Sequence, residues 1–269
     1  MNFQIKSKIS SNELNKQIER HLQELANKTD KARTSEEMIR YLDFCAKFHQ
    51  YSAGNIWLIL MANPDASYVA GYQSWKTMGR WVKRGEHGIP ILAPVLEKEE
   101  DGDIGEEQYL VGFRVVHVFD FAQTDGDPIP PVPNWKSPEK NLELQTKLIE
   151  FAKTRRIKVT IEKLEGDTQG ISKGGSIVLS PQAGTKTLIH EIAHELLHKD
   201  EYSQLSRAKK EMEAEVVGYI VSRSFGLDKL ASPNYLILQG VSPRLIIDDC
   251  ERIKRYASKI IKYVIRKPD

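Results

Sequence analysis

The stretch TLIHEIAHELLH, residues 187–198, places His190 and His194 four residues apart, with Glu191 directly after the first histidine. On an α-helix, residues at i and i+4 lie on the same face, one turn apart. Two neutral imidazoles at this separation can bind one tetrahedral metal ion. The flanking side chains are mostly apolar, so we expect a largely buried helix over residues 184–199. Because unpaired imidazoles and carboxylates are costly to bury, the stretch favours a metal centre over an amphipathic helix with incidental histidines.

Glu191 is the candidate catalytic residue of this helix. It points about 100° around the helix axis from His190, which makes it a poor ligand for the same ion. It can instead reach a water molecule at the open position of the metal and accept its proton. The spacing is that of the HExxH motif, so we expect Zn²⁺, although two histidines and a carboxylate also accept other divalent metals.

The third histidine of the stretch, His198, is not expected to be a ligand. It lies about 12 Å along the helix axis from His190, too far for one ion to bind all three histidines. Leu197 and Asp200 also stand where the longer metzincin motif requires glycine and histidine. We expect His198 to be a residue of the last helical turn, where a basic side chain favours the helix C-terminus.

A third ligand is expected from KKEMEAEVVGY, residues 209–219, because a catalytic zinc usually has three protein ligands. Glu211 and Glu215 share one helical face, whereas Glu213 points elsewhere. In the gluzincin arrangement, one glutamate of the downstream helix binds the metal, and a residue four positions later supports a ligating histidine. This assigns Glu211 as ligand and Glu215 as the supporting residue, and the reverse order also fits the spacing.

GGSIVLSP, residues 174–181, is expected to be a half-exposed strand directly before the histidine helix. In zinc peptidases of this architecture, an edge strand pairs with the backbone of the substrate. The strand therefore favours peptide substrates over small molecules.

The composition allows two modest domains of the α+β class. Of the 269 residues, 40% are hydrophobic and 28% are charged, which is typical of a globular protein with a buried core. Five prolines among residues 124–140 indicate a boundary. We therefore expect a first domain over residues 1–125, a linker over 126–138 and a second domain over 139–269.

A cytoplasmic protein without a membrane segment is the simplest expectation. Residues 1–20 contain no apolar core of a secretory signal, and no window approaches 18 uninterrupted apolar residues. Cys45 and Cys250 are far apart in sequence, and neither has a cysteine or histidine neighbour. Both are expected to be reduced packing residues.

Residues 75–88 combine aromatic and basic side chains in the pattern of a nucleic-acid-binding surface. Basic side chains follow phosphates and aromatic faces stack on unpaired bases, so a nucleic-acid surface of this kind would have little sequence preference. The overall charge of +2 neither requires nor excludes such a partner. The alternative is that the tryptophans belong to the core and the cations are merely solvated. The candidate DNA-binding residues are Tyr51, Trp75, Lys76, Arg80, Trp81, Lys83 and Arg84.

HEIAH followed by EMEAE resembles the ImmA/IrrE-like zinc metallopeptidases and the related peptidase domain of ArdC-type antirestriction proteins. YSAGNIWLILMANPDASYVAGYQSWKTMGRWVKRGEHGIPILAP, residues 51–94, and GFRVVHVFD, residues 112–120, resemble the single-stranded-DNA-binding domain of the ArdC family. The resemblance implies a small α+β DNA-binding domain followed by a zincin-like metallopeptidase domain.

The expected function is that of a single-stranded-DNA-binding zinc metallopeptidase. From the resemblance, it would act on proteins at DNA, in antirestriction or in the protection of incoming mobile-element DNA. One alternative is a non-proteolytic DNA-binding protein with a structural zinc domain, and another is a repressor-cleaving protease of the ImmA type. Three ligands beside a glutamate base favour an open catalytic site, since structural zinc usually has four protein ligands.

Overall fold

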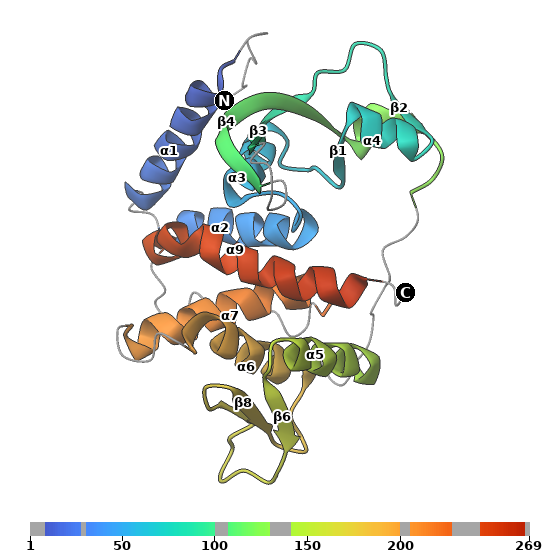
Figure 1. Ribbon diagram of the computed structural model, residues 1–269. Helices are drawn as coiled ribbons and strands as arrows, with labels where there is room; N and C mark the ends of the chain where they lie inside the picture. Colours follow the sequence, from blue (N-terminus) through green and yellow to red (C-terminus); the bar gives the residue numbers. More distant parts are fainter. Residues whose placement is uncertain are drawn as a thin grey trace. The chain divides into compact units, whose positions relative to one another are not determined.

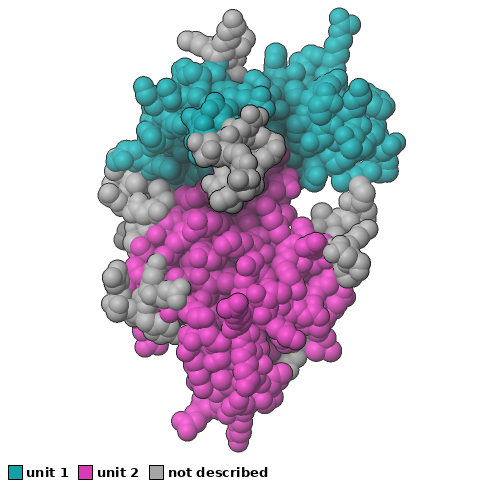
Figure 2. All heavy atoms as spheres, viewed as in Figure 1, with its two compact units in different colours: residues 1–27, 54–130 teal, residues 28–53, 131–269 magenta. Residues whose placement is uncertain are grey.

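The computed structural model describes residues 9–27, 31–99, 107–129, 141–199, 205–227 and 243–266 (Figure 1). The chain divides into two compact units, coloured separately in Figure 2. Unit 1 comprises Met1–Asn27 and Gly54–Pro130, and unit 2 comprises Lys28–Ala53 and Pro131–Asp269. Both contain helices and strands, which confirms the α+β class. Among the described residues, no helix has the length and apolar character needed to span a membrane.

The two units differ from the division expected from the sequence. The segment Lys28–Ala53 belongs to unit 2, although it precedes most of unit 1 along the chain. Most of the expected linker, residues 126–138, lies outside the described residues. The expectation of two sequential domains is therefore too simple, because one helix of the N-terminal half packs with the C-terminal half.

Unit 1 contains a three-stranded antiparallel sheet with helices against it, and a two-stranded antiparallel sheet of β2 and β5. Helix α3 is almost entirely apolar, and its Ile56, Trp57 and Ile59 are buried. Strands β3 and β4 form a long hairpin, and β1 pairs with the other edge of β4. The Asn55 side chain exchanges two 2.8 Å hydrogen bonds with the backbone of Leu92, which fixes α3 to β3. The elements of unit 1 are α1 (Ser11–Asn27), α3 (Ala53–Ala62), β1 (Val69–Gly71), α4 (Tyr72–Thr77), β2 (Arg80–Val82), β3 (Ile89–Glu99), β4 (Glu107–Asp120), the 3-10 helix η1 (Phe121–Gln123) and β5 (Thr124–Gly126).

Unit 2 is built around helix α7, whose residues from Met212 to Ser222 are mostly buried. Helix α7 contacts α2, α6 and α9, and the sheet lies at the far side of α6 (Figure 1). Asp43 of α2 accepts 2.8 Å hydrogen bonds from Tyr219 and Arg223 of α7, which explains why α2 belongs to this unit. The elements are α2 (Lys31–Lys47), α5 (Leu142–Thr154), β6 (Lys158–Ile161), β7 (Gly170–Ser172), β8 (Ser176–Leu179), α6 (Thr185–His198), α7 (Arg207–Ser224) and α9 (Pro243–Ile265).

The expected edge strand of residues 174–181 is instead the central strand of its sheet. Strand β8 pairs in parallel with β6 on one side and antiparallel with β7 on the other. Its Ile177, Val178 and Leu179 are all buried, so the strand is not half-exposed. The alternation of the sequence shows which residues share a face, but it carries no information about strand order. The edge that lies beside α6 is β7.

Cys45 and Cys250 are brought together although they are far apart in sequence. Both are free thiols, and both lie near the Tyr41 hydroxyl, with which they interact electrostatically. Burial raises the pKa of both thiols, to about 11 for Cys250. Such thiols are poor nucleophiles, which agrees with the expected role in packing.

Candidate metal centre

Helix α6 presents its two expected ligands on one face. Its apolar residues Leu188, Ile189 and Ile192 are buried in the core of unit 2. His190 and His194 lie one turn apart, with ring centroids 4.7 Å from each other. Their Nε2 atoms are 3.0 Å apart, so the two rings converge on one point instead of pointing along parallel directions.

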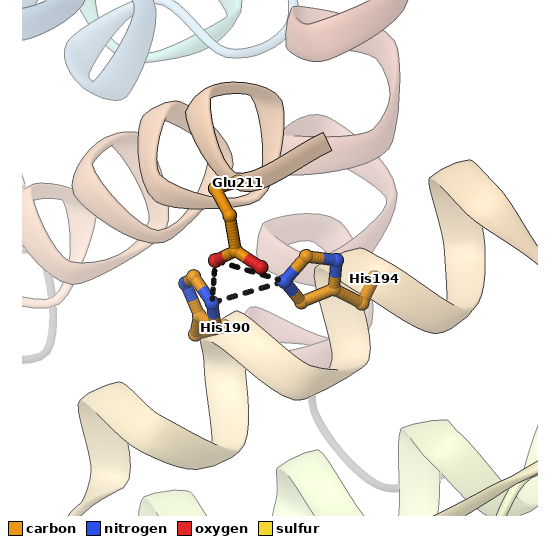
Figure 3. A group of neighbouring side chains, drawn as sticks. All are labelled: His190, His194 and Glu211. Carbon is orange, nitrogen blue, oxygen red and sulfur yellow. Dashed lines mark hydrogen bonds and ion pairs between the residues drawn. The ribbon is translucent and has the colours of Figure 1, made fainter. Parts of the chain in front are cut away.

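Helix α7 supplies a carboxylate to the same point. The Oε2 atom of Glu211 lies 3.4 Å from Nε2 of His190 and 3.5 Å from Nε2 of His194 (Figure 3). Zinc–ligand bonds of about 2.0–2.2 Å in a tetrahedral site require ligand atoms roughly 3.3–3.6 Å apart. Both carboxylate distances fit this spacing, and the shorter separation of the nitrogens is that of their hydrogen bond. Among the described residues, these three form the one cluster of donors suited to a metal ion.

Glu215 lies on the opposite side of the His190 ring. Its Oε2 is 3.4 Å from Nδ1 of His190, and its Oε1 is 2.7 Å from Nζ of Lys186. A carboxylate on Nδ1 orients the imidazole so that Nε2 faces the ion. Of the two orders that the sequence left open, the geometry favours Glu211 as ligand and Glu215 as support.

The electrostatics of the cluster suit a cation. Burial lowers the pKa of His190, but hydrogen bonds with Glu211 and Glu215 outweigh this effect and raise the pKa to about 9. Burial and the neighbouring His190 cation lower the pKa of His194 to about 4. The hydrogen bond with His190 lowers the pKa of Glu211 to about 2. Glu211 and Glu215 thus stabilise a positive charge at the point where the three ligand atoms converge.

Glu191 is held between α6 and β7. Its side chain is buried, and burial raises the pKa of its carboxyl group. A Cβ atom at Gly170 of β7 would lie 2.8 Å from Cγ of Glu191, so only glycine permits this close approach. The backbone of Ser172 also hydrogen-bonds with the Glu191 carboxylate. Glu191 therefore has a fixed position beside the two histidines without being a member of the ligand cluster.

Glu195 was not identified from the sequence as a site residue. Its buried carboxylate accepts hydrogen bonds from the Ser172 hydroxyl and from the backbone N–H groups of Lys173, Gly174 and Gly175, at 2.5–3.1 Å. These bonds attach the β7–β8 turn to α6. The sequence feature that could have identified this contact is the glycine pair Gly174–Gly175, because successive backbone N–H groups in such a turn can bind a carboxylate.

His198 is the last residue of α6, as expected, but its side chain is not a solvated basic group. His198 is only 3% exposed, and its ring lies between His194 and Glu213. Glu213, which was expected to point away from the site, is fully buried. The i+4 spacing places His198 beneath His194, where it can act on that ring without binding the ion.

An open pocket of about 680 Å³ adjoins the cluster. One wall is β7 with Thr168, and the opposite wall is the start of α7, including Arg207 and Lys210. His190, Glu191, His194 and Glu211 line it between these walls. The pocket is therefore large enough for a segment of a substrate beside the candidate ligands.

The candidate DNA-binding residues separate into buried and exposed groups. Trp75 is fully buried and its Nε1 donates a 2.9 Å hydrogen bond to the Phe119 carbonyl. Arg80 is also buried, donates to Thr124 and lies over the Phe121 ring. The expectation that these two residues contact DNA is therefore wrong, because both are part of the core of unit 1.

The other candidate residues lie at the surface of unit 1, except Tyr51. Trp81 is 59% exposed, and Lys76 and Arg84 are exposed as well. Lys83 is partly engaged, with its Nζ 2.9 Å from the Ala122 carbonyl. Tyr51 belongs to unit 2, where its ring meets the edge of Phe48. We use the name α4–β2 surface for four exposed residues and the half-buried Lys83, namely Tyr72, Lys76, Trp81, Lys83 and Arg84.

Residues 8–119 match the family model of the N-terminal domain of the anti-restriction factor ArdC. Because residues 8–119 are similar to that domain, we call them the ArdC-like region. An uncharacterized protein of Bacillus anthracis is 26% identical, in an alignment that covers 72% of this chain and 41% of that protein. The chain thus aligns with less than half of that relative.

Two crystal structures of the antirestriction ArdC protein from the R388 plasmid also align with the chain. The metal-free structure has a TM-score of 0.41 and 18% identity, over 80% of this chain and 84% of that one. The Mn(II)-bound structure has a TM-score of 0.39 and 16% identity, over 85% of this chain and 99% of that one.

The ArdC-like region and the compact units do not coincide. The matched residues contain most of unit 1, but they also contain α2, which packs in unit 2. The donor cluster of α6 and α7 lies beyond the matched residues. The α4–β2 surface therefore lies in the ArdC-like region, whereas the metal centre rests on its own geometry.

Proposed function

We propose that the chain is an antirestriction protein of the ArdC type that binds single-stranded DNA and hydrolyses peptide bonds with a divalent metal. The main support is that His190, His194 and Glu211 converge beside the buried Glu191, at an open pocket. These three residues would hold the ion, and Zn²⁺ is the metal expected from the HExxH pattern.

The chemistry divides between the ion and the protein. A divalent ion at this place would polarise the scissile carbonyl and lower the pKa of a water molecule. Glu191 would accept the proton of the attacking water on its carboxylate and pass it to the departing amine. Burial raises the pKa of the Glu191 carboxyl group, and a carboxylate with a raised pKa is a stronger proton acceptor than an ordinary one.

Strand β7 supports a peptide as substrate. It is the terminal strand of its sheet, and Gly170, Ile171 and Ser172 line the pocket beside Glu191. An extended peptide can add to such an edge through backbone hydrogen bonds, with its scissile bond near the histidines. This role was expected of residues 174–181 and passes to β7, because β8 has both edges paired.

The DNA-binding part of the proposal rests on the ArdC-like region and on its surface residues. The family is described as an anti-restriction factor, which supports an action linked to invading DNA. Exposed Tyr72 and Trp81 can stack on bases, while Lys76 and Arg84 can contact phosphates.

The competing function is a DNA-binding protein in which the metal only stabilises unit 2. A structural zinc site is normally closed by four protein ligands. The described residues offer three, and all three line the open pocket. This arrangement favours the catalytic proposal.

The decisive experiment is a crosslinking pull-down with the Glu191→Gln protein, with and without single-stranded DNA. The variant should retain metal and trap an uncleaved protein, which the wild-type protein cuts. Dependence of trapping on DNA would support action at DNA. If wild-type and Glu191→Gln proteins protect DNA equally and neither captures nor cuts a protein, the peptidase proposal is wrong.

A further inference from the structure

A chain of hydrogen bonds leads from His194 to the C-terminal helix α9. Nδ1 of His194 lies 3.2 Å from Nδ1 of His198, and Nε2 of His198 lies 2.7 Å from Oε2 of Glu213. Nη2 of Arg252, on α9, donates to the same Oε2 at 2.6 Å. His198 is 3% exposed and Glu213 is fully buried, so water competes little for these bonds.

One assignment of protons satisfies all three of these hydrogen bonds. If Nε2 of His194 offers its lone pair to an ion, Nδ1 of the same ring carries hydrogen and donates to His198. His198 then accepts on Nδ1 and donates from Nε2 to Glu213. Glu213 accepts from both His198 and Arg252. The direction of donation is fixed at Glu213, because an ionised carboxylate can only accept hydrogen bonds and the arginine beside it can only donate.

Arg252 has a defined part in this chain. A carboxylate as buried as Glu213 is costly unless a positive charge pairs with it. The Arg252 guanidinium supplies that charge from α9, and it leaves the orientation of the carboxylate fixed toward His198. Arg252 thereby connects helix α9 to the hydrogen bonds that begin at His194.

We propose that His198, Glu213 and Arg252 are positioning residues that fix the tautomer and the ring orientation of His194 for metal binding. The inference rests on the proposed metal centre. Glu213 and Arg252 would support His194 as Glu215 and Lys186 support His190, with a carboxylate paired to a basic side chain behind the ring. The difference is that His194 reaches its carboxylate through a second imidazole.

The test measures Zn²⁺ affinity by competition with a chromogenic chelator, for His198→Phe, Glu213→Gln and Arg252→Met. Loss of such supporting bonds typically weakens metal binding about 10- to 100-fold, which is the expected result for each variant. Arg223→Met is the matched control. Arg223 also lies 2.8 Å from a carboxylate, that of Asp43. Its side chain is 32% exposed, compared with 25% for Arg252, and its carboxylate partner is not Glu213. Its affinity should equal that of the wild-type protein.

A double variant separates positioning from general loss of stability. Because Glu213 acts through His198, the His198→Phe/Glu213→Gln protein should bind Zn²⁺ as tightly as His198→Phe alone. The visible spectrum of the Co²⁺-loaded Glu213→Gln protein should also differ from that of the wild-type protein. Wild-type affinity in Glu213→Gln and Arg252→Met, or additive losses in the double variant, would overturn the inference.

The outcomes also separate this inference from the proposed function. If the wild-type protein binds Zn²⁺ but cuts no protein, the peptidase proposal fails. The Zn²⁺ affinities of the variants still test whether His198, Glu213 and Arg252 position His194. If the wild-type protein binds no divalent ion, both fail together. Circular dichroism of each metal-free variant establishes that the compared proteins are folded.

Discussion

The two histidines of α6 differ in what lies behind them. Both direct Nε2 toward Glu211, but Nδ1 of His190 faces Glu215 and Nδ1 of His194 faces His198. The two rings therefore have different protonation behaviour, although they occupy equivalent places in the motif. The higher pKa belongs to His190, which has carboxylates on both sides.

Metal binding should release a proton from His190. Its pKa of about 9 means that the ring is charged at pH 7, and ligation requires the neutral form. His194, with a pKa of about 4, is already neutral and releases none. We expect about one proton per ion at pH 7, and an affinity that rises with pH and levels off above about pH 9.

Calorimetric titration with Zn²⁺ in buffers of different ionisation enthalpy measures this proton. The slope of observed heat against buffer enthalpy should correspond to release of about one proton at pH 7. A heat that does not depend on the buffer would show that His190 is already neutral, contrary to the expectation.

At the scale of elements, the sequence predicted what is local and missed what depends on distant segments. The i,i+4 pairs placed His190, His194 and Glu211 correctly on two helices, because a helix fixes such relations by itself. The order of β6, β8 and β7 was missed, since strand pairing joins segments that alternation does not identify. The buried position of Glu213 was also missed, because it depends on Arg252 of α9.

Glu195 joins two elements, and its loss should be felt as a loss of stability. The Glu195→Gln variant directs an amide NH₂ at groups that themselves donate hydrogen bonds. We expect the free energy of unfolding to fall by about 2–4 kcal/mol, as for the loss of bonds to a buried charged group.

Urea denaturation of Glu195→Gln measures this effect, with Glu150→Gln as the control. Glu150 lies exposed on α5, so its variant should differ from the wild-type protein by less than about 0.5 kcal/mol. Equal stability of the two variants would contradict the account of the β7–β8 turn.

At the scale of the whole molecule, the chain order and the compact units are interleaved. Helix α2 precedes the sheet of unit 1 in sequence, yet its Asp43 binds α7. Composition and the proline-rich stretch suggested a simple boundary, because they report on linkers and not on which helices pack together. The aromatic and basic residues of the N-terminal half likewise gave a pattern, but only burial separated Trp75 and Arg80 from the α4–β2 surface.

The α4–β2 surface should account for binding of single-stranded DNA. Trp81→Ala should weaken binding by about 1–3 kcal/mol, roughly 5- to 150-fold, if the indole stacks on a base. Arg84→Glu should weaken binding and also lower the steepness of its salt dependence. Fluorescence anisotropy with a labelled oligonucleotide at several salt concentrations measures both.

Lys153→Glu provides the control for charge reversal, since Lys153 is exposed on α5 of unit 2. It should leave the affinity and the salt dependence unchanged. Wild-type affinity in both Trp81→Ala and Arg84→Glu would remove this surface from the account.

The central claim is that α6 and α7 together form a centre for one divalent metal ion, and its most direct test is metal content after dialysis against Zn²⁺ and gel filtration. The wild-type and Glu191→Gln proteins should each retain about one ion per chain, because Glu191 is not a ligand, whereas His194→Ala and Glu211→Ala should retain much less. A wild-type protein without bound metal, or a His194→Ala protein that retains a full equivalent, would contradict the claim.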